Sequence, residues 1–169
     1  MSRDTPRPWM PREEWDRLVR GENCPLCGAC RSTVLADDYG HTIADLAFSR
    51  LRLARNQFIK GYSILICHKH VQEPYHLSRE ERVQFFGDML VAGQAVERVF
   101  APVKMNFQLL GNAVPHLPVH IVPRYYGDAA PGAPIDPTLK KVVLEGHEYA
   151  ERVHVIREAL EAVRRAEAE

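Results

Sequence analysis

A short apolar segment that carries two histidines, residues 111–124, constrains this sequence more than any other part. Its valine, leucine and isoleucine content is typical of a buried β-strand. Because side chains alternate along a strand, we expect His116, Pro118 and His120 to project to one face. The segment begins with a glycine–asparagine pair and ends with a proline–arginine pair, which is typical of a strand between turns. Each histidine alone could be a hydrogen-bonded core residue, but two on one face favour a functional site.

Length and composition indicate one globular domain with terminal extensions. The chain has 169 residues, of which 46% are hydrophobic and 26% charged, enough for a sizeable core. Lys and Arg together number 22, as do Asp and Glu, so we expect no nucleic-acid partner, although a small phosphate-bearing ligand is compatible with this balance. No apolar run reaches the roughly 18 residues of a membrane span, and the proline-rich start lacks the apolar core of an export signal. We therefore expect a cytoplasmic protein with no membrane partner.

The four cysteines include a Cys-x-x-Cys motif formed by Cys24 and Cys27. In a cytoplasmic protein, cysteines are metal ligands or free thiols more often than disulfides. This spacing places two thiolates within reach of one tetrahedral ion, and the glycine that follows suits a tight turn. A redox dithiol is the alternative, but it favours a helix that opens at the first cysteine, and Gly28 argues against such a helix. A closed metal site needs two more ligands, and spacing alone leaves these candidates: Cys30, His41, His68, His70, His76, His116 and His120.

Hydrophobic periodicity predicts helices near both ends and in the middle of the chain. A short helix over 12–20 should stop at Gly21, and a long helix should begin with a capping box of Ser78 and Glu81 and end near residue 100. The core-facing side of the long helix should carry an apolar stripe of Val83, Phe86, Met89 or Leu90, Val96 and Val99. A final helix carries a narrow stripe that suits either the same domain or a partner subunit: Tyr149, Val153, Ile156, Leu160 and Val163.

Strand-like segments occupy 42–48, 51–54, 62–70 and 103–110. In the third of these, alternation puts His68 and His70 on one face and Cys67 on the other, where we expect a buried thiol. The last one should form an antiparallel hairpin with the histidine-bearing segment through a glycine–asparagine turn. The chain therefore divides into an arm with a short helix (1–22), a main domain (23–128), a proline-rich connection (129–147) and a C-terminal helix (148–169).

The histidine-bearing segment resembles the histidine-triad (HIT) superfamily, whose signature is His-φ-His-φ-His-φ-φ with φ apolar, often followed by Pro-Arg. Residues 116–124, His-Leu-Pro-Val-His-Ile-Val-Pro-Arg, fit this signature except at its centre. Residues 110–115 are similar to the Gly-Asn/Gln-x-Val-Pro lead-in of bacterial members, and residues 56–71 are similar to the upstream strand pair. The resemblance covers about residues 24–128. It implies an α+β, HIT-like fold with a mostly antiparallel sheet of about five strands and a long packed helix, usually in a homodimer.

The resemblance also implies a structural zinc ion. Zinc-bearing members, including the galactose-1-phosphate uridylyltransferase branch, are similar to this chain in a Cys-x-x-Cys motif, a mid-chain histidine and the first histidine of the triad. Carried over, that gives Cys24, Cys27, His70 and His116 as the Zn²⁺ ligands, with His68 as the fallback. Two sulfurs and two nitrogens suit tetrahedral zinc.

A nucleotide pocket is the third implication of the resemblance. Family enzymes attack the α-phosphate of a bound nucleotide with the central histidine, and water or a second substrate then resolves the nucleotidyl-histidine. Such chemistry needs an in-line nucleophile and donors for the charged oxygens. The third histidine, His120, would hold phosphate oxygens, and Asn112 and Gln57 are weaker candidates for sugar or phosphate contacts.

The central position of the signature is Pro118, which has neither a nucleophilic nitrogen nor a backbone N–H. The family mechanism cannot run without its nucleophile, whose loss costs on the order of 10³ to 10⁶ in rate. A proline also removes a ladder hydrogen bond, so we expect it at an edge, a bulge or an unpaired position. Three functions remain open: a non-catalytic nucleotide or phosphate binder, an enzyme of related or divergent chemistry that uses His120 or another group, and a zinc-stabilised structural or interaction module. The retained His120, Asn112 and Arg124 favour a ligand.

Overall fold

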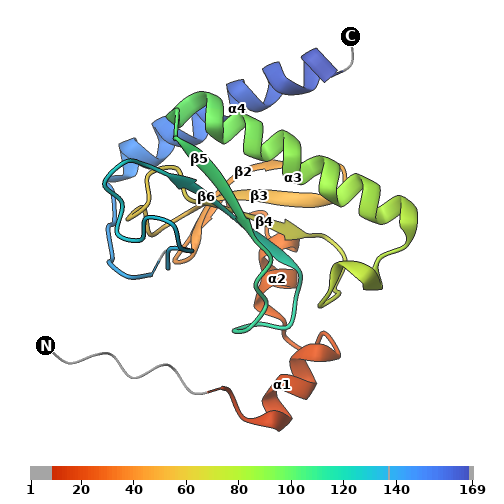
Figure 1. Cartoon of the computed structure of the whole chain (residues 1–169). Helices are drawn as coiled ribbons and strands as arrows, with labels where there is room; N and C mark the ends of the chain where they lie inside the picture. The colour runs from red at the N-terminus through yellow and green to blue at the C-terminus, as the bar shows by residue number, and fades with distance from the viewer. Residues whose placement is uncertain (1–8, 137, 168–169) are drawn as a thin grey trace, which may run out of the picture.

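The computed structural model describes residues 9–136 and 138–167, so the first eight residues of the predicted arm and the last two of the predicted final helix lie outside it. Its strands form one antiparallel sheet in the order β1-β2-β3-β4-β6-β5 (Figure 1). This is the predicted α+β architecture with a mostly antiparallel sheet, with six strands where about five were expected. The strands are β1 (Ala36–Asp37), β2 (Gly40–Asp45), β3 (Ser49–Ala54), β4 (Ser63–Cys67), β5 (Lys104–Gln108) and β6 (Pro118–Arg124). The helices are α1 (Arg12–Val19), α2 (Pro25–Arg31), η1 (Pro74–His76), α3 (Arg79–Phe100) and α4 (Gly146–Glu167).

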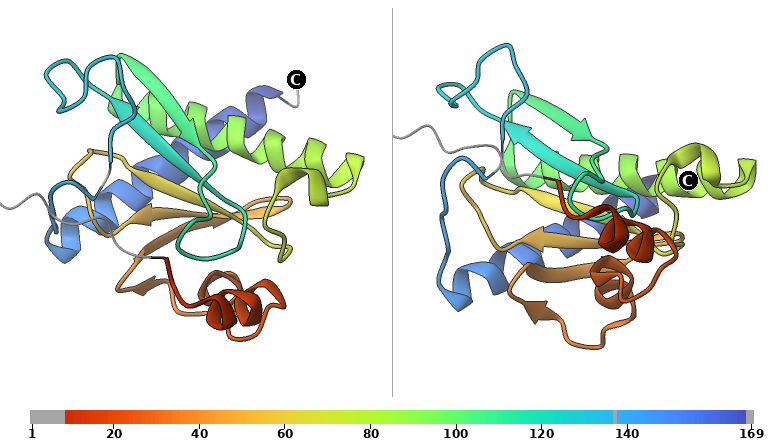
Figure 2. Two further views of the ribbon diagram at one scale, coloured as in Figure 1. Left: turned by 60° about the horizontal axis from the view of Figure 1, so that its bottom comes forward. Right: turned by 90° about the horizontal axis from the view of Figure 1, so that it is seen from below.

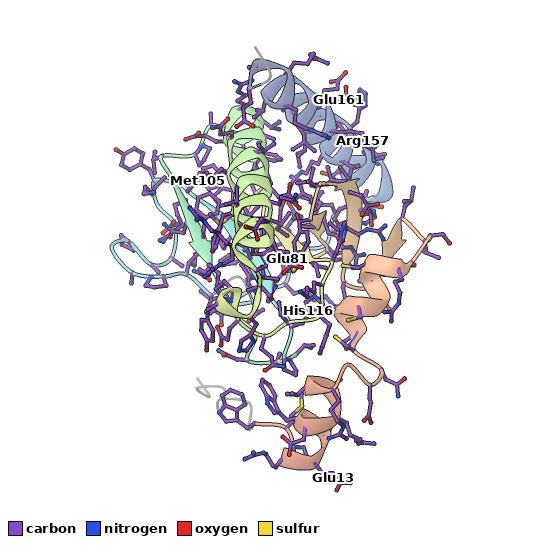
Figure 3. The ribbon with its side chains drawn as sticks, turned by 90° about the vertical axis from the view of Figure 1, so that its right-hand side faces the viewer. Glu13, Glu81, Met105, His116, Arg157 and Glu161 are labelled. Atoms are coloured by element: carbon purple, nitrogen blue, oxygen red, sulfur yellow. The ribbon has the colours of Figure 1, made fainter. Side chains whose placement is uncertain are left out.

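Helices α3 and α4 cover one face of the sheet, and the main hydrophobic core lies between them and the strands (Figures 1 and 2). Alternate residues of β3, β4 and β6 point into this core. They include Cys67, whose side chain is fully buried as predicted. Helix α4 buries its predicted stripe within the same domain, and Arg157 on α4 donates a hydrogen bond to the carbonyl of Ile43 (Figure 3). In the described residues, no helix is long and apolar enough to cross a bilayer.

Helix α3 begins with the predicted capping box of Ser78 and Glu81. Its buried face contains part of the predicted stripe, because Val96 is buried and Met89 and Val99 pack against the core. Val83 is 69% exposed and does not belong to this face, and Leu90, the alternative to Met89, is 55% exposed. A buried carboxylate helps to set the face: Asp88 accepts hydrogen bonds from the chain between β2 and β3, at Ala47 N, Phe48 N and Ser49 Oγ. Turning the helix to bury Val83 would pull this carboxylate off its three donors.

The opposite face of the sheet presents the triad residues. Cross-strand pairing places Pro118 beside Ile66, and His120 beside Ile64, on this face. Helix α2 covers part of it, because Arg50 of β3 donates to two carbonyls at the end of α2, those of Ala29 and Ser32. We call the uncovered part, around Pro118 and His120, the open face. Strand β6 begins at Pro118, so the proline takes the first position of a strand, where a missing N–H is tolerated.

Candidate metal centre and triad pocket

Four side chains converge at the end of the sheet that faces α1 and α2, where Figure 3 shows His116. The ligand atoms of Cys24, Cys27, His70 and His116 all lie within 4.8 Å of one another. The two histidine Nδ1 atoms are 3.2 Å apart, and the Nδ1···Sγ distances are 3.3 to 3.6 Å. Zn–N and Zn–S bonds of about 2.0 and 2.3 Å in a tetrahedron require about 3.3 Å between nitrogens and about 3.6 Å between nitrogen and sulfur. The cluster therefore has the dimensions of a zinc site.

Helix α2 supplies the two thiols. Cys24 is its N-cap residue and Cys27 lies in its first turn, so a helix does open at the first cysteine and the expectation of a tight turn was wrong. Pro25 at the first helical position favours this start, and an exposed glycine inside a helix costs only about 1 kcal/mol, so Gly28 does not prevent it. All four cysteines of the chain are free. The metal interpretation stands because two histidines face the thiols.

The two histidines present Nδ1 to the cluster because Nε2 is bound elsewhere. Nε2 of His116 donates to the carbonyl of Cys67 at 2.8 Å, and Nε2 of His70 donates to the carbonyl of Val19 at 3.1 Å. Each bond leaves Nδ1 unprotonated, which is the form that ligates a metal. It also holds the ring in its orientation before any ion arrives.

Neither histidine lies in a regular strand, contrary to the sequence prediction. Strand β4 ends at Cys67 and β6 begins at Pro118, so the strand alternation does not extend to positions 68, 70 and 116. His68 is exposed and lies 3.4 Å from Asp45, outside the cluster. The fallback ligand is therefore not part of this site.

Burial determines the protonation of these groups. It raises the pKa of the Cys27 thiol to about 11, with a further contribution from neighbouring Cys24, and it lowers the pKa of His116. The protein alone thus favours a neutral thiol at Cys27 and a neutral imidazole at His116. A divalent cation reverses that preference for the thiols, since thiolates pair with its charge and release protons to solvent. Two sulfur and two imidazole donors suit zinc better than magnesium or calcium.

His120 lies on the open face and is held by Tyr62. The phenol oxygen is 2.5 Å from Nδ1 of His120, and the two rings stack with centroids 5.9 Å apart. Burial lowers the pKa of His120 and raises the pKa of Tyr62, so both are neutral near pH 7. A phenol O–H is a good donor and a poor acceptor, so it donates to Nδ1 and leaves the Nε2–H of His120 as a free donor.

Residues 40–127 match the HIT domain family, which is just over half of the chain. The chain belongs to the HIT domain family. It is 28% identical to "Protein hit" of Bacillus subtilis (strain 168) over 113 residues, or 62% of this chain and 72% of that protein. Similar solved structures include a Zn-bound histidine triad family protein from Mycobacterium smegmatis (TM-score 0.62, 16% identity, 85% of this chain and 97% of that one). Another is a hypothetical histidine triad nucleotide-binding protein from Sulfolobus tokodaii strain7 (TM-score 0.65, 17% identity, 84% and 95%). These structures share the fold.

Two residues that the HIT resemblance pointed to are fully engaged within the protein. Gln57 is 4% exposed; its amide donates to the carbonyls of Ala54 and Tyr62 and accepts from Gly61 N and Arg152. No atom of this amide remains for the predicted nucleotide contact unless one of these bonds breaks. Gln57 instead orders the loop that carries Tyr62, and so it supports His120 indirectly.

Arg124 is engaged in the same way. Its guanidinium has five N–H groups, and they donate to Asp128, Asn106 and the carbonyls of Ala130 and Ala133. Arg124 therefore ties the loop after β6 to β5, and it gives no support to a ligand site. The Arg124 guanidinium in turn lowers the pKa of Asp128 to about 2.

Asn112, the remaining predicted contact, is exposed in the connection between β5 and β6. It lines a cavity of about 230 Å³ together with Pro118 and both tryptophans of the chain, Trp9 and Trp15. The sequence analysis missed the tryptophans and Tyr62. Their signal was weak, because an aromatic residue in an N-terminal arm or at the start of a strand has no spacing that points to a site.

Proposed function

We propose that this HIT-family chain binds a nucleotide or another phosphate-bearing small molecule at its open face and does not use covalent nucleotidyl-histidine chemistry. One observation carries the proposal: the triad segment keeps His120 as an ordered neutral donor, while its attacking position is Pro118. A purely structural protein has no need of a half-buried histidine that is oriented by a tyrosine and has a free Nε2–H.

Binding in this proposal depends on donors rather than on a nucleophile. The Nε2–H of His120 and the side-chain amide of Asn112 donate to phosphate oxygens, and each bond to a charged oxygen contributes about 1.5–3 kcal/mol. Arg52 lies in the same cross-strand row as His120 and supplies positive charge, although it also pairs with Asp37 at 2.8 Å. Its buried Nε has no hydrogen-bond partner in the described structure. The ring of Pro118 offers no lone pair, so a bound phosphate ester is held without being attacked.

We propose that Cys24, Cys27, His70 and His116 hold a structural Zn²⁺ ion. A bound ion cross-links α2 to the segments that follow β4 and precede β6. These segments border the open face, so the four ligands hold the start of β6, and with it Pro118, in place. The Zn-bound relative from Mycobacterium smegmatis supports this assignment at the level of the fold.

A second candidate is an enzyme that uses His120 itself as base or nucleophile. The hydrogen bond to Tyr62 also favours this candidate if its direction is reversed, because Nδ1–H would then donate to the phenol and leave a lone pair on Nε2. Turnover separates this enzyme from the binder.

We further propose that the protein forms a homodimer through β5. We also propose that it works in a reducing compartment such as the cytoplasm. Strand β5 ends the order of the described sheet, so its outer edge has no strand partner there. Val103 and Leu109, which flank it, are 54% and 41% exposed. An open edge with apolar neighbours favours pairing with a second copy. The free thiols suit a reducing compartment.

Calorimetric titration of the zinc-loaded protein with AMP, GMP and diadenosine tetraphosphate tests the proposal. We expect at least one ligand to bind, and His120→Gln to weaken binding by about 10- to 100-fold, the value of one hydrogen bond to a charged group. His154→Gln is the matched control, because His154 is exposed on α4. Chromatography of the incubated ligands detects turnover: release of product that His120→Gln abolishes supports the enzyme. Absence of binding by all three ligands contradicts both candidates.

A further inference from the structure

The cavity beside Pro118 has a wall that does not come from the matched HIT residues. Trp9 and Trp15 lie N-terminal to residue 40, and their rings pack edge to face with centroids 5.5 Å apart. They lie opposite the connection between β5 and β6, which supplies Asn112, Pro115 and other residues of the cavity. In Figures 1 and 2 this connection and α1 lie at the same end of the sheet.

Core packing does not explain these tryptophans. None of the residues of α1 is buried, and Trp9 is 69% exposed. The helix is instead held near the domain by the bond between its Val19 carbonyl and His70 and by the contacts of its indoles around the cavity. Large aromatic side chains that remain accessible at a concave site are typical of ligand recognition.

The polar groups of the cavity define what it can bind. Among the residues that the structure describes, its lining contains no lysine, arginine or histidine, and Glu73 is the one charged residue. Arg12, on the far side of the indole pair, is already paired with Asp16 at 3.0 Å. The side chains of Glu73, Gln72 and Asn112 make no hydrogen bond with the described residues, so they are free to meet a ligand. A carboxylate with no cation beside it repels a phosphate and attracts N–H donors.

We propose that this cavity binds a flat aromatic group that carries N–H donors and no negative charge, such as a protonated arylalkylamine or an aminated heterocycle. Indole rings attract flat rings and cations, and the Glu73 carboxylate accepts the N–H groups. This site shares Asn112 and Pro118 with the proposed phosphate site, but its binding does not require a bound phosphate. The cavity and the phosphate site therefore differ in the sign of charge that they accept.

Tryptophan fluorescence reads this site selectively, because both tryptophans of the chain line the cavity. The zinc-loaded protein is excited at the red edge of the indole band and titrated with phenethylamine and with phenylacetate, which share a ring and differ in charge. Adenosine serves as the uncharged aminated heterocycle. We expect a saturable change with phenethylamine, with adenosine or with both, and the two arms distinguish an amine from a heterocycle. Phenylacetate should bind more weakly than the better of these two by about tenfold or more. A response that fails to saturate with either ligand, or equal affinity for phenylacetate, overturns the proposal.

Two variants separate recognition from packing. Glu73→Gln should weaken the binding of whichever of the two ligands saturates by about tenfold, the loss of a charge-assisted bond. Glu13→Gln should leave it unchanged, because Glu13 is exposed on α1 and does not line the cavity (Figure 3). Trp15→Phe keeps an aromatic wall and should retain binding that Trp15→Ala loses, with helix content checked by circular dichroism. Unchanged affinity in Glu73→Gln overturns the proposal. AMP binding at His120 should persist in Glu73→Gln, so failure here and failure of the proposed function are distinguishable.

Discussion

Replacing one metal ligand, Cys27→Ser, should remove the zinc ion and a measurable part of the stability. Cys27 is 7% exposed and its sulfur lies 3.3 and 3.6 Å from the Nδ1 atoms of His70 and His116. A serine hydroxyl at this position is a poor zinc ligand and leaves three donors in a site built for four. Cys30→Ser is the matched control: Cys30 lies one turn further along α2, with its sulfur near the carbonyl of Cys67 and outside the cluster.

The size of the effect follows from linkage between binding and folding. An ion present at about 1,000 times its dissociation constant stabilises the native state by about 4 kcal/mol. For a chain of this length, 1 kcal/mol corresponds to about 2–4 °C in the melting temperature, so loss of zinc should lower the Tm by about 8–16 °C. Because Nε2 of each histidine is held by a backbone carbonyl, the rings are preorganised, and the ordering cost that opposes binding is small.

The assay is metal content by mass spectrometry together with thermal unfolding, with and without a chelator. We expect about one zinc per chain in the wild type and in Cys30→Ser, and none in Cys27→Ser. Chelator should lower the Tm of the first two proteins to that of Cys27→Ser and leave Cys27→Ser unchanged. A Cys27→Ser protein that retains full zinc and the wild-type Tm would refute the ligand assignment.

Three further predictions concern single side chains. Asp88→Asn places an amide N–H against buried backbone donors and should lower stability by about 2 kcal/mol, seen as a Tm about 4–8 °C lower; an unchanged Tm contradicts the role of this carboxylate. Burial keeps the pKa of His120 below its unfolded value, so the unfolded chain binds more protons and stability falls as the pH drops through about 6.5. Urea unfolding of His120→Gln should show a flatter pH dependence than the wild type. Arg124→Lys cannot supply five donors, so the pKa of Asp128 should rise from about 2, as measured by NMR titration.

The sequence predicted the fold well because its long elements are periodic. The capping box at Ser78 and the stripe on α4 required only local patterns, and both are present in the structure. The buried face of α3 was harder to predict. Met89, Val96 and Val99 face the core as predicted, but apolar Val83 fits the same period and is exposed. The hydrogen bonds that Asp88 accepts from the adjacent turn help to set this face, and a periodic pattern does not reveal them.

The candidate metal site shows how a residue set can be predicted while its local structure is not. Spacing left seven partners open for Cys24 and Cys27, and the family resemblance, rather than geometry, selected His70 and His116. The sequence analysis took Gly28 as a helix breaker, but Pro25 at the first turn favours a helix more than one exposed glycine opposes it.

The residues around the open face were harder to interpret, because a sequence does not show which polar atoms are already bonded. Gln57 and Arg124 were attractive as ligand contacts, and the protein uses all their hydrogen-bonding groups internally. Tyr62 and Trp15 lie far from the triad signature in sequence. Only the packing of the sheet and of α1 brings them to His120 and to the Pro118 cavity.

Pro118→His tests the central claim most directly. The variant and the wild type are incubated with an adenosine phosphoramidate, and AMP release and adenylylated protein are followed by chromatography and intact mass. If the open face binds nucleotides and lacks only its nucleophile, the wild type should bind AMP without forming an adduct. The variant should then release AMP faster by on the order of 10³ or more. A wild-type protein that forms the adduct, or that releases AMP as fast as the variant, would contradict the account.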